Sequence, residues 1–433
     1  MIESVIFFFS GSGMVMLFIL FMRINVVGSK SKLVKHRSKE PGFVDLLIYA
    51  SVVDEGVIVG KDGSLMAAWA YQGVDSNSST EAERDQVSLQ INHALSRMGS
   101  GWMIHIDAVR KPAPGYSAKD DSHFPDPVSA AIDEERREFF ERVGTLYESN
   151  YVITATYLPP LLAQQKFVEL MFDDEGVPVD SKTRTIALLN HFKRECANIE
   201  SHLSSVFRMK RLKGKIITKE DNSSVNYDAF LRWIQFCISG LDHPVILPKN
   251  PIYLDALLSG QEFWGGVVPK IGQNFIQVVS IEGFPLASSP GLINSLADLP
   301  CLYRWSTRFI FMDTHEAVGH LEKFSKKWKQ KIRSFFDQVF NSHSSNVDQN
   351  AINMVSDAQA AIAETNSGEV AQGYYTSVVV LMSESRGDLE ASARQVAKAI
   401  NHLGFTARIE TINTIDAYLG SLPGHGVENV RRP

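Results

Sequence analysis

The sequence holds little cysteine and none of the spacings that cysteine chemistry requires. Its 433 residues include only three cysteines, Cys196, Cys237 and Cys301, which lie far apart and are odd in number. Such a set provides neither a disulfide framework nor a zinc-ligand pattern. We interpret the three thiols as core residues of a protein kept in a reducing, cytoplasmic setting.

No complete catalytic, metal-binding or phosphate-binding motif is present either. The nearest match is Gly56–Asp62, GVIVGKD. A P-loop has four residues between its glycines and a Ser or Thr after its lysine. Here three residues intervene, and Asp62 follows Lys61 with a carboxylate that repels phosphate. The β-branched residues favour a hairpin strand, so we assign no catalytic, cofactor or metal residues to this chain.

The net charge of −6 and the pI near 6.1 do not indicate a nucleic-acid-binding protein overall. Basic residues do cluster at 208–219 and along a helical pattern at 321–336. A nucleic-acid-contacting module that uses these basic segments is therefore our alternative function. The first cluster lacks aromatic residues on which bases could stack, which favours a solvated loop.

Charge is absent from Val5–Met22, a run of 18 residues. That length is near the minimum for a membrane-spanning helix. Basic residues follow without an acid, which predicts a single-pass anchor at the bacterial inner membrane with the bulk of the chain on the cytoplasmic face. A buried soluble helix is the alternative. The expected contacts with membrane or anionic lipid are Phe7, Phe8, Leu17, Phe18, Leu20, Arg23, Lys30, Lys32, Lys35 and Arg37.

Two stretches of the chain repeat one pattern of elements. In the first stretch, two strands flank the Asp-Gly turn at Asp62. They are followed by a helix, the strand Trp102–Val109, a second helix and the strand Tyr151–Tyr157. A similar order begins near residue 261. We therefore predict an α+β fold: an N-terminal transmembrane helix, then two ferredoxin-like α+β units with a helical middle segment. We expect Trp69 and Trp102 in the core.

These patterns define the expected domains. They are a transmembrane anchor (1–23), a basic juxtamembrane linker (24–42), a first α+β unit (43–158), a connector and helical segment (159–260), a second α+β unit (261–412) and a linker (413–433). The last assignment rests on a short helical pattern that runs into a stretch dense in Gly and Pro.

Several long segments resemble one family in the same order. They are DLLIYASVVDEGVIVGKDGSLMAAWAYQG, SRMGSGWMIHIDAVRKPAPGY, HFPDPVSAAIDEERREFF, YLPP and the terminal TINTIDAYLGSLPGHGVENVRRP. These segments resemble the N-terminal region of TrbE-type conjugal transfer ATPases of type IV secretion systems, in the CagE/TrbE/VirB family. The resemblance covers the chain from about Phe43 to Pro433.

The resemblance implies an inner-membrane ATPase that powers pilus assembly and DNA transfer. In that family a P-loop motor follows the region matched here, so ATP and magnesium are expected only in a motor domain beyond Pro433. The chain alone is then expected to be inactive as an enzyme. Its implied role is membrane docking and assembly, with inner-membrane channel subunits and other secretion ATPases as partners. The intact protein is expected to form a hexamer-like ring.

Overall fold

The computed structural model describes residues 42–73, 78–159, 179–218, 224–248, 252–285, 291–339 and 349–430. The chain divides into two compact units, residues 1–46 and 47–433. Of the first unit, the described residues contain one short helix, α2 (Phe43–Leu46). All other elements belong to the second unit.

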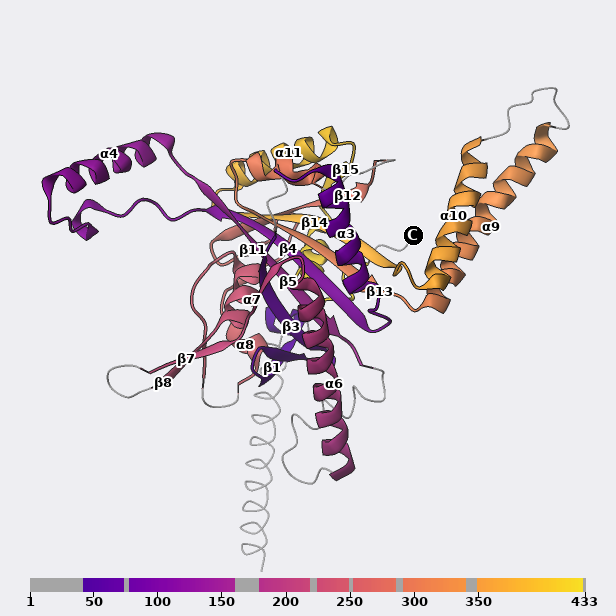
Figure 1. Ribbon diagram of the computed structural model, residues 1–433, viewed down its shortest axis with the longest axis horizontal. Coiled ribbons are helices and arrows are strands. Elements are labelled where there is room, and N and C mark those ends of the chain that lie inside the picture. Colours follow the sequence, from indigo (N-terminus) through magenta and orange to yellow (C-terminus); the bar gives the residue numbers. More distant parts are fainter. Residues whose placement is uncertain are drawn as a thin grey trace, which may run out of the picture. The chain divides into compact units, whose positions relative to one another are not determined.

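A twelve-stranded sheet forms the centre of the second unit (Figure 1). Its strands, in spatial order, are β1 (Tyr49–Asp54), β2 (Val57–Gly60), β3 (Leu65–Gln72), β5 (Tyr147–Tyr157), β4 (Trp102–Pro112), β13 (Tyr303–Phe311), β14 (Gly373–Ser383), β12 (Asn274–Gly283), β11 (Lys270–Ile271) and β10 (Phe263–Trp264). Two more strands lie beside this row: β6 (Arg208–Arg211) pairs with β3, and β15 (Thr406–Ile409) pairs with β12. A small second sheet contains β7 (Gly214–Thr218), β8 (Ser224–Asp228) and β9 (Ile246–Leu247).

The two halves of the large sheet repeat one topology. In the first half the spatial order is β6-β3-β5-β4, with α3 (Glu81–Leu95) between β3 and β4 and α6 (Val179–Leu203) between β5 and β6. In the second half it is β15-β12-β14-β13, with the 3₁₀ helix η2 (Leu292–Asp298) and α11 (Arg386–His402) in the corresponding places. Both follow the βαββαβ plan of a ferredoxin-like unit. The sequence predicted two α+β units, but it counted the helix before Tyr151 in the first unit and assigned the segments of α6 and β6 to the connector (159–260).

The structure nevertheless corrects the predicted fold class, which began with a transmembrane helix. Across the residues that the structure describes, no helix combines the length and the apolar character needed to cross a membrane. The predicted span, Val5–Met22, lies outside the described residues. The two ferredoxin-like units share one sheet, because β4 and β13 pair antiparallel from Arg110–Tyr303 to Met103–Ile310. This pairing satisfies two strand edges that would otherwise be exposed.

Helices cover both faces of the sheet. On one face, α3 and α6 pack on the first half and α11 on the second. Trp69 is 0% exposed and Trp102 is 7% exposed on this face, which confirms the expectation that both are core residues. The other face carries α7 (Ala229–Ser239), α8 (Leu254–Leu258), α12 (Thr414–Leu419) and the segment that follows α12.

Each half also carries a helical insertion between its second and third strands in chain order. Residues 113–146, between β4 and β5, contain the 3₁₀ helix η1 (Lys119–Asp121) and α4 (Pro127–Val143). The insertion between β13 and β14 is built on α9 (Thr314–Val339) and α10 (Gln349–Ser367). Because β4 and β13 are antiparallel neighbours, the two insertions leave the sheet at opposite ends (Figure 1).

Candidate functional site

The segment from α12 to residue 425 lies buried against the sheet, although its sequence reads as a loop. Tyr418, Leu422 and His425 are each 0% exposed, and Ser421 is 1% exposed. Gly424 has φ +88°, and a Cβ there would lie 2.2 Å from the Met66 sulfur, so the chain passes the sheet too closely for a side chain. We call residues 411–430 the strap.

A buried loop must find partners for its backbone carbonyls, and Arg304 on β13 supplies several donors. Its Nη1 donates to the Ser421 carbonyl at 2.8 Å and to Asp107 Oδ1 at 2.8 Å, and its Nη2 donates to Ser421 Oγ at 2.6 Å. Ser306 Oγ adds a bond of 3.1 Å to the same carbonyl. Asp107, on β4, thus joins the first half of the sheet to this contact.

Arg308, four residues further along β13, binds only backbone. Its Nη1 donates to the carbonyls of Gly420 at 3.1 Å and His425 at 2.9 Å, and its Nη2 donates to that of Asn429 at 2.9 Å. Its side chain is 1% exposed. A single guanidinium therefore gathers three carbonyls from a ten-residue stretch, because its donors are fixed in a planar fork.

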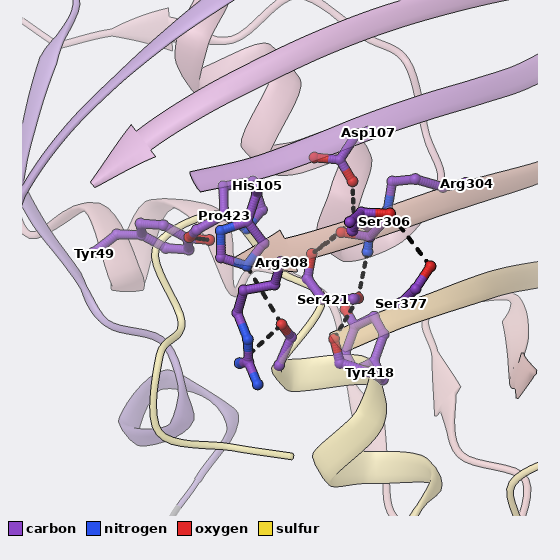
Figure 2. Close-up of polar contacts among 12 residues, drawn as sticks. Tyr49, His105, Asp107, Arg304, Ser306, Arg308, Ser377, Tyr418, Ser421 and Pro423 are labelled. Carbon is purple, nitrogen blue, oxygen red and sulfur yellow. Dashed lines mark hydrogen bonds and ion pairs between the residues drawn. The ribbon is translucent and has the colours of Figure 1, made fainter. Parts of the chain in front are cut away.

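Two tyrosines and a threonine hold the strap at further points, and Figure 2 shows the tyrosines, Tyr49 and Tyr418. Tyr49 on β1 donates to the Pro423 carbonyl at 2.8 Å, and Tyr418 of the strap donates to the Ile238 carbonyl of α7 at 2.6 Å. Thr414 Oγ1 lies 3.1 Å from the Val267 carbonyl. The strap is thus tied to β1, β13, α7 and the loop before β11.

Burial governs the electrostatics of this cluster, which we call the arginine clamp (Asp107, Arg304 and Arg308). Burial raises the pKa of the Asp107 carboxyl, and Arg304 opposes that rise. Burial works against the charge on Arg304, but Cys237 and Asp107 raise its pKa overall. Burial lowers the pKa of Arg308 to about 10, so it remains charged at neutral pH. His105 beside them is neutral, because burial and the charge of Arg308 hold its pKa well below 6.5.

The depressed pKa of His105 predicts that stability falls on acidification. The unfolded chain binds a proton at this histidine below about pH 6.5, whereas the folded chain does not. The stabilisation is therefore present above pH 6.5 and is lost as the pH falls toward the folded pKa, by up to about 1.4 kcal/mol per pH unit. Urea unfolding at pH 7.5 and 5.5 should show a smaller difference for His105→Gln than for the wild type. If stability changes equally between the two pH values in the variant and in the wild type, His105 is not the source of the pH dependence.

The clamp binds a segment of its own chain. The guanidinium donors that form its hydrogen bonds point to backbone carbonyls, to Asp107 and to Ser421, all within the protein. Among the described residues, no cluster of three or more His, Cys, Asp or Glu side chains is placed to hold a metal ion.

The predicted site residues have different outcomes. The expected membrane contacts, from Phe7 to Arg37, lie outside the described residues. The interpretation of Gly56–Asp62 as a hairpin strand is confirmed, because Val57–Gly60 forms β2 and pairs with β1 and β3. Lys61 Nζ lies 2.6 Å from an Asp255 carboxylate oxygen.

Two members of the basic stretch at 208–219 have structural partners. The guanidinium of Arg211 lies 4.4 Å from the centre of the Trp69 ring and donates to the Gly56 carbonyl at 3.0 Å. Lys213 lies 3.2 Å from a carboxylate oxygen of Glu55. These contacts give no support to nucleic-acid binding at this stretch.

Reasoning from the sequence missed the arginine clamp. The one available signal was the strand pattern Tyr303–Phe311, YRWSTRFIF, in which alternation places Arg304, Ser306 and Arg308 on one face. Two arginines and a serine on the same face of a central strand indicate a buried polar partner, since charged side chains are rarely buried unpaired.

The fold and the clamp define a class: a large α+β scaffold of two fused ferredoxin-like units, closed by a buried strap. Residues 215–431 match the family described as "CagE, TrbE, VirB family, component of type IV transporter system". Residues 56–165 match "Type IV secretion system ATPase VirB4/TrbE, N-terminal domain". The chain belongs to the CagE/TrbE/VirB family, as its sequence segments indicated.

Individual relatives agree with this assignment. The chain is 43% identical over 400 residues to the conjugal transfer protein TrbE of Rhizobium radiobacter, an alignment that covers 92% of this chain and 48% of the relative. In Sinorhizobium fredii the probable conjugal transfer protein TrbE is divided into two chains. The first is 49% identical over 125 residues, covering 29% of this chain and 84% of the relative. The second is 43% identical over 243 residues, covering 56% of this chain and 37% of the relative. The chain thus spans about half the length of the R. radiobacter protein.

Proposed function

We propose that this chain is the docking and assembly region of a type IV secretion ATPase that acts in conjugal transfer. In this proposal it binds membrane-embedded channel subunits and other secretion ATPases at the cytoplasmic side of the bacterial inner membrane. ATP and magnesium are bound by a separate motor region, which drives pilus assembly and DNA transfer.

The observation that carries the proposal is the single sheet that both halves share, with a helical insertion at each end. A continuous antiparallel sheet with helices on both faces is a rigid support, and the insertions offer surfaces of their own. The clamp supports the same role, because Arg304 and Arg308 fix the strap to β13 through buried bonds. A motor joined to the strap would then be mechanically coupled to the sheet.

Competition in a donor cell tests the proposal. The chain is expressed in a donor that carries an intact TrbE-type conjugation system, and transconjugants are counted. If the chain occupies the docking sites without supplying a motor, about a tenfold excess over the intact protein should lower transfer by about tenfold. A plasmid that transfers through an unrelated system serves as the control and should be unaffected.

The result that contradicts the proposal is unchanged transfer while the folded chain accumulates to that excess. A fall in transfer of both plasmids would point to general toxicity and would also count against docking. Salt-sensitive retention of the purified chain on DNA, with no effect on transfer, would favour the nucleic-acid alternative.

A further inference from the structure

A small pocket lies between α7 and the ends of β4 and β5 from which the α4 insertion leaves. One face of α7 lines it with four residues at helical spacing: Ala229, Arg232, Trp233 and Phe236. The apolar side chains of Val109, Val152 and Leu212 line it from the sheet and from the segment after β6. Its volume is about 240 Å³, below the roughly 300–1,000 Å³ typical of pockets for drug-sized ligands and cofactors. The pocket therefore has room for a group about the size of one large side chain.

Trp233 brings a hydrogen-bond donor without a partner to this pocket. The residue is 8% exposed, and its ring stacks on that of Phe236 with the ring centroids 5.9 Å apart. In the part of the chain that the structure describes, the indole Nε1 has no hydrogen-bond partner and is closed to bulk water. Native proteins seldom leave a buried donor unpaired, because this costs free energy. A water molecule here would find few further partners among the apolar walls. The pocket therefore favours a ligand that combines apolar surface with an acceptor atom.

The rim of the pocket carries charges that balance one another. Lys111 Nζ lies 3.0 Å from Asp242 Oδ2 and 3.3 Å from Glu148 Oε1. Arg232 Nε lies 2.6 Å from Asp242 Oδ1. Two cations and two carboxylates thus neutralise each other at the mouth. A charged ligand would have to break these pairs, so the rim favours a neutral ligand.

We infer that the pocket binds the side chain of a tyrosine presented by a partner protein. Tyrosine joins an aromatic ring to a hydroxyl oxygen that accepts a hydrogen bond, and it is uncharged at neutral pH. Phenylalanine has no acceptor, and tryptophan has only a donor. In the bound state the tyrosine ring fills the apolar cavity, and a small rotation of the Trp233 indole brings its N–H to the tyrosine hydroxyl. Aromatic side chains seated in pockets are the anchors of many protein interfaces.

The inference rests on the proposed docking function for the source of the tyrosine, and it deepens that function by naming the chemistry of one contact. A partner protein is favoured over free tyrosine because the free amino acid carries an ammonium and a carboxylate group. Those charges would lie at the rim, where Lys111 and Arg232 are already engaged by carboxylates of this chain. Transfer between cells and binding to this pocket are measured in separate experiments, so either proposal can fail while the other holds.

Binding of blocked amino acids to the full chain tests the inference. N-acetyl-tyrosine amide and N-acetyl-phenylalanine amide differ by one oxygen atom. The tyrosine amide should bind about tenfold more tightly, because its oxygen pairs a donor that is otherwise left unpaired. In an isotope-edited NMR spectrum it should also move the indole N–H signal of Trp233 downfield, whereas the phenylalanine amide should not. Equal affinities of the two amides, or an unmoved Trp233 signal, would overturn the inference.

A substitution at Trp233 shows whether its N–H group makes the distinction. Trp233→Phe keeps an aromatic ring and removes the donor, so the two amides should then bind with equal affinity. The variant also identifies the Trp233 signal by its absence. Trp264→Phe is the matched control, since the same replacement at a 59% exposed tryptophan on β10 should keep the tenfold preference. A folded Trp233→Phe chain that still prefers the tyrosine amide would contradict the proposed contact, and the comparison of the two amides on the wild type decides the matter if the variant does not fold.

Free tyrosine distinguishes the two sources of the ring. Because its ammonium and carboxylate groups meet a rim whose charges are already paired, it should bind no more tightly than N-acetyl-tyrosine amide. Tighter binding of the free amino acid would overturn the assignment of a partner protein as the source.

Discussion

Deletion of residues 411–433, which include the strap, is expected to abolish cooperative unfolding of the chain. The deletion removes Tyr418, Leu419 and Leu422, each at most 3% exposed, and uncovers the sheet beneath them. Burial of each such side chain contributes about 2–3 kcal/mol. Arg304 and Arg308 lose the carbonyls that they bind, at about 1–3 kcal/mol for each buried group left without a partner. The total is comparable to the whole stability of a domain, about 5–15 kcal/mol.

Urea titration followed by tryptophan fluorescence and near-UV circular dichroism measures this loss of cooperative unfolding. The deleted chain should lose its near-UV signal and show a broad transition of low slope. Val427→Ala is the control within the strap, because Val427 is 86% exposed and its truncation should change stability by less than about 0.5 kcal/mol. A sharp transition with the midpoint of the full chain would show that the strap is not part of the folded core.

Local patterns in the sequence predicted several strands and turns of the sheet. The Asp-Gly turn and the flanking apolar runs predicted the β2–β3 hairpin, which is formed. The pattern Thr80-Glu81-Ala82-Glu83 is typical of a capping box, and Glu83 accepts from the Thr80 backbone N–H at 2.8 Å. These features depend on residues close in sequence, so the sequence alone carries them. The pairing of β4 with β13 joins segments nearly 200 residues apart, and no local pattern encodes it.

The strap could not be predicted for a related reason. Its Gly and Pro residues exclude regular structure, and a loop is expected at the surface because its backbone needs hydrogen-bond partners. Here the partners are Arg304 and Arg308, more than 100 residues earlier in the chain. The burial of the strap is therefore a property of two separated segments together.

The arginine clamp itself gives the second large effect. Arg304→Met is expected to cost about 3–5 kcal/mol, because it leaves Asp107, at 0% exposure, as a buried carboxyl without its cation. Replacing both partners, as Arg304→Met with Asp107→Leu, should cost less than the single change, because the buried carboxyl that Arg304 paired is then removed as well. Arg386→Met is the control, since Arg386 forms an exposed pair with Glu390 and should cost less than about 1 kcal/mol.

The pH dependence separates this explanation from a simple loss of packing. Burial already raises the pKa of Asp107, and removal of Arg304 withdraws the charge that opposes the rise. In Arg304→Met the Asp107 carboxyl is therefore neutral in the folded state over a wider pH range. The unfolded chain ionises this carboxyl at a lower pH than the folded chain does, so the stability of the variant falls as the pH rises. The difference in unfolding free energy between the variant and the wild type should grow from pH 5 to pH 8, and it should not grow for the double variant. A pH-independent difference would mean that the variant loses contacts with Ser421 rather than the charge balance at Asp107.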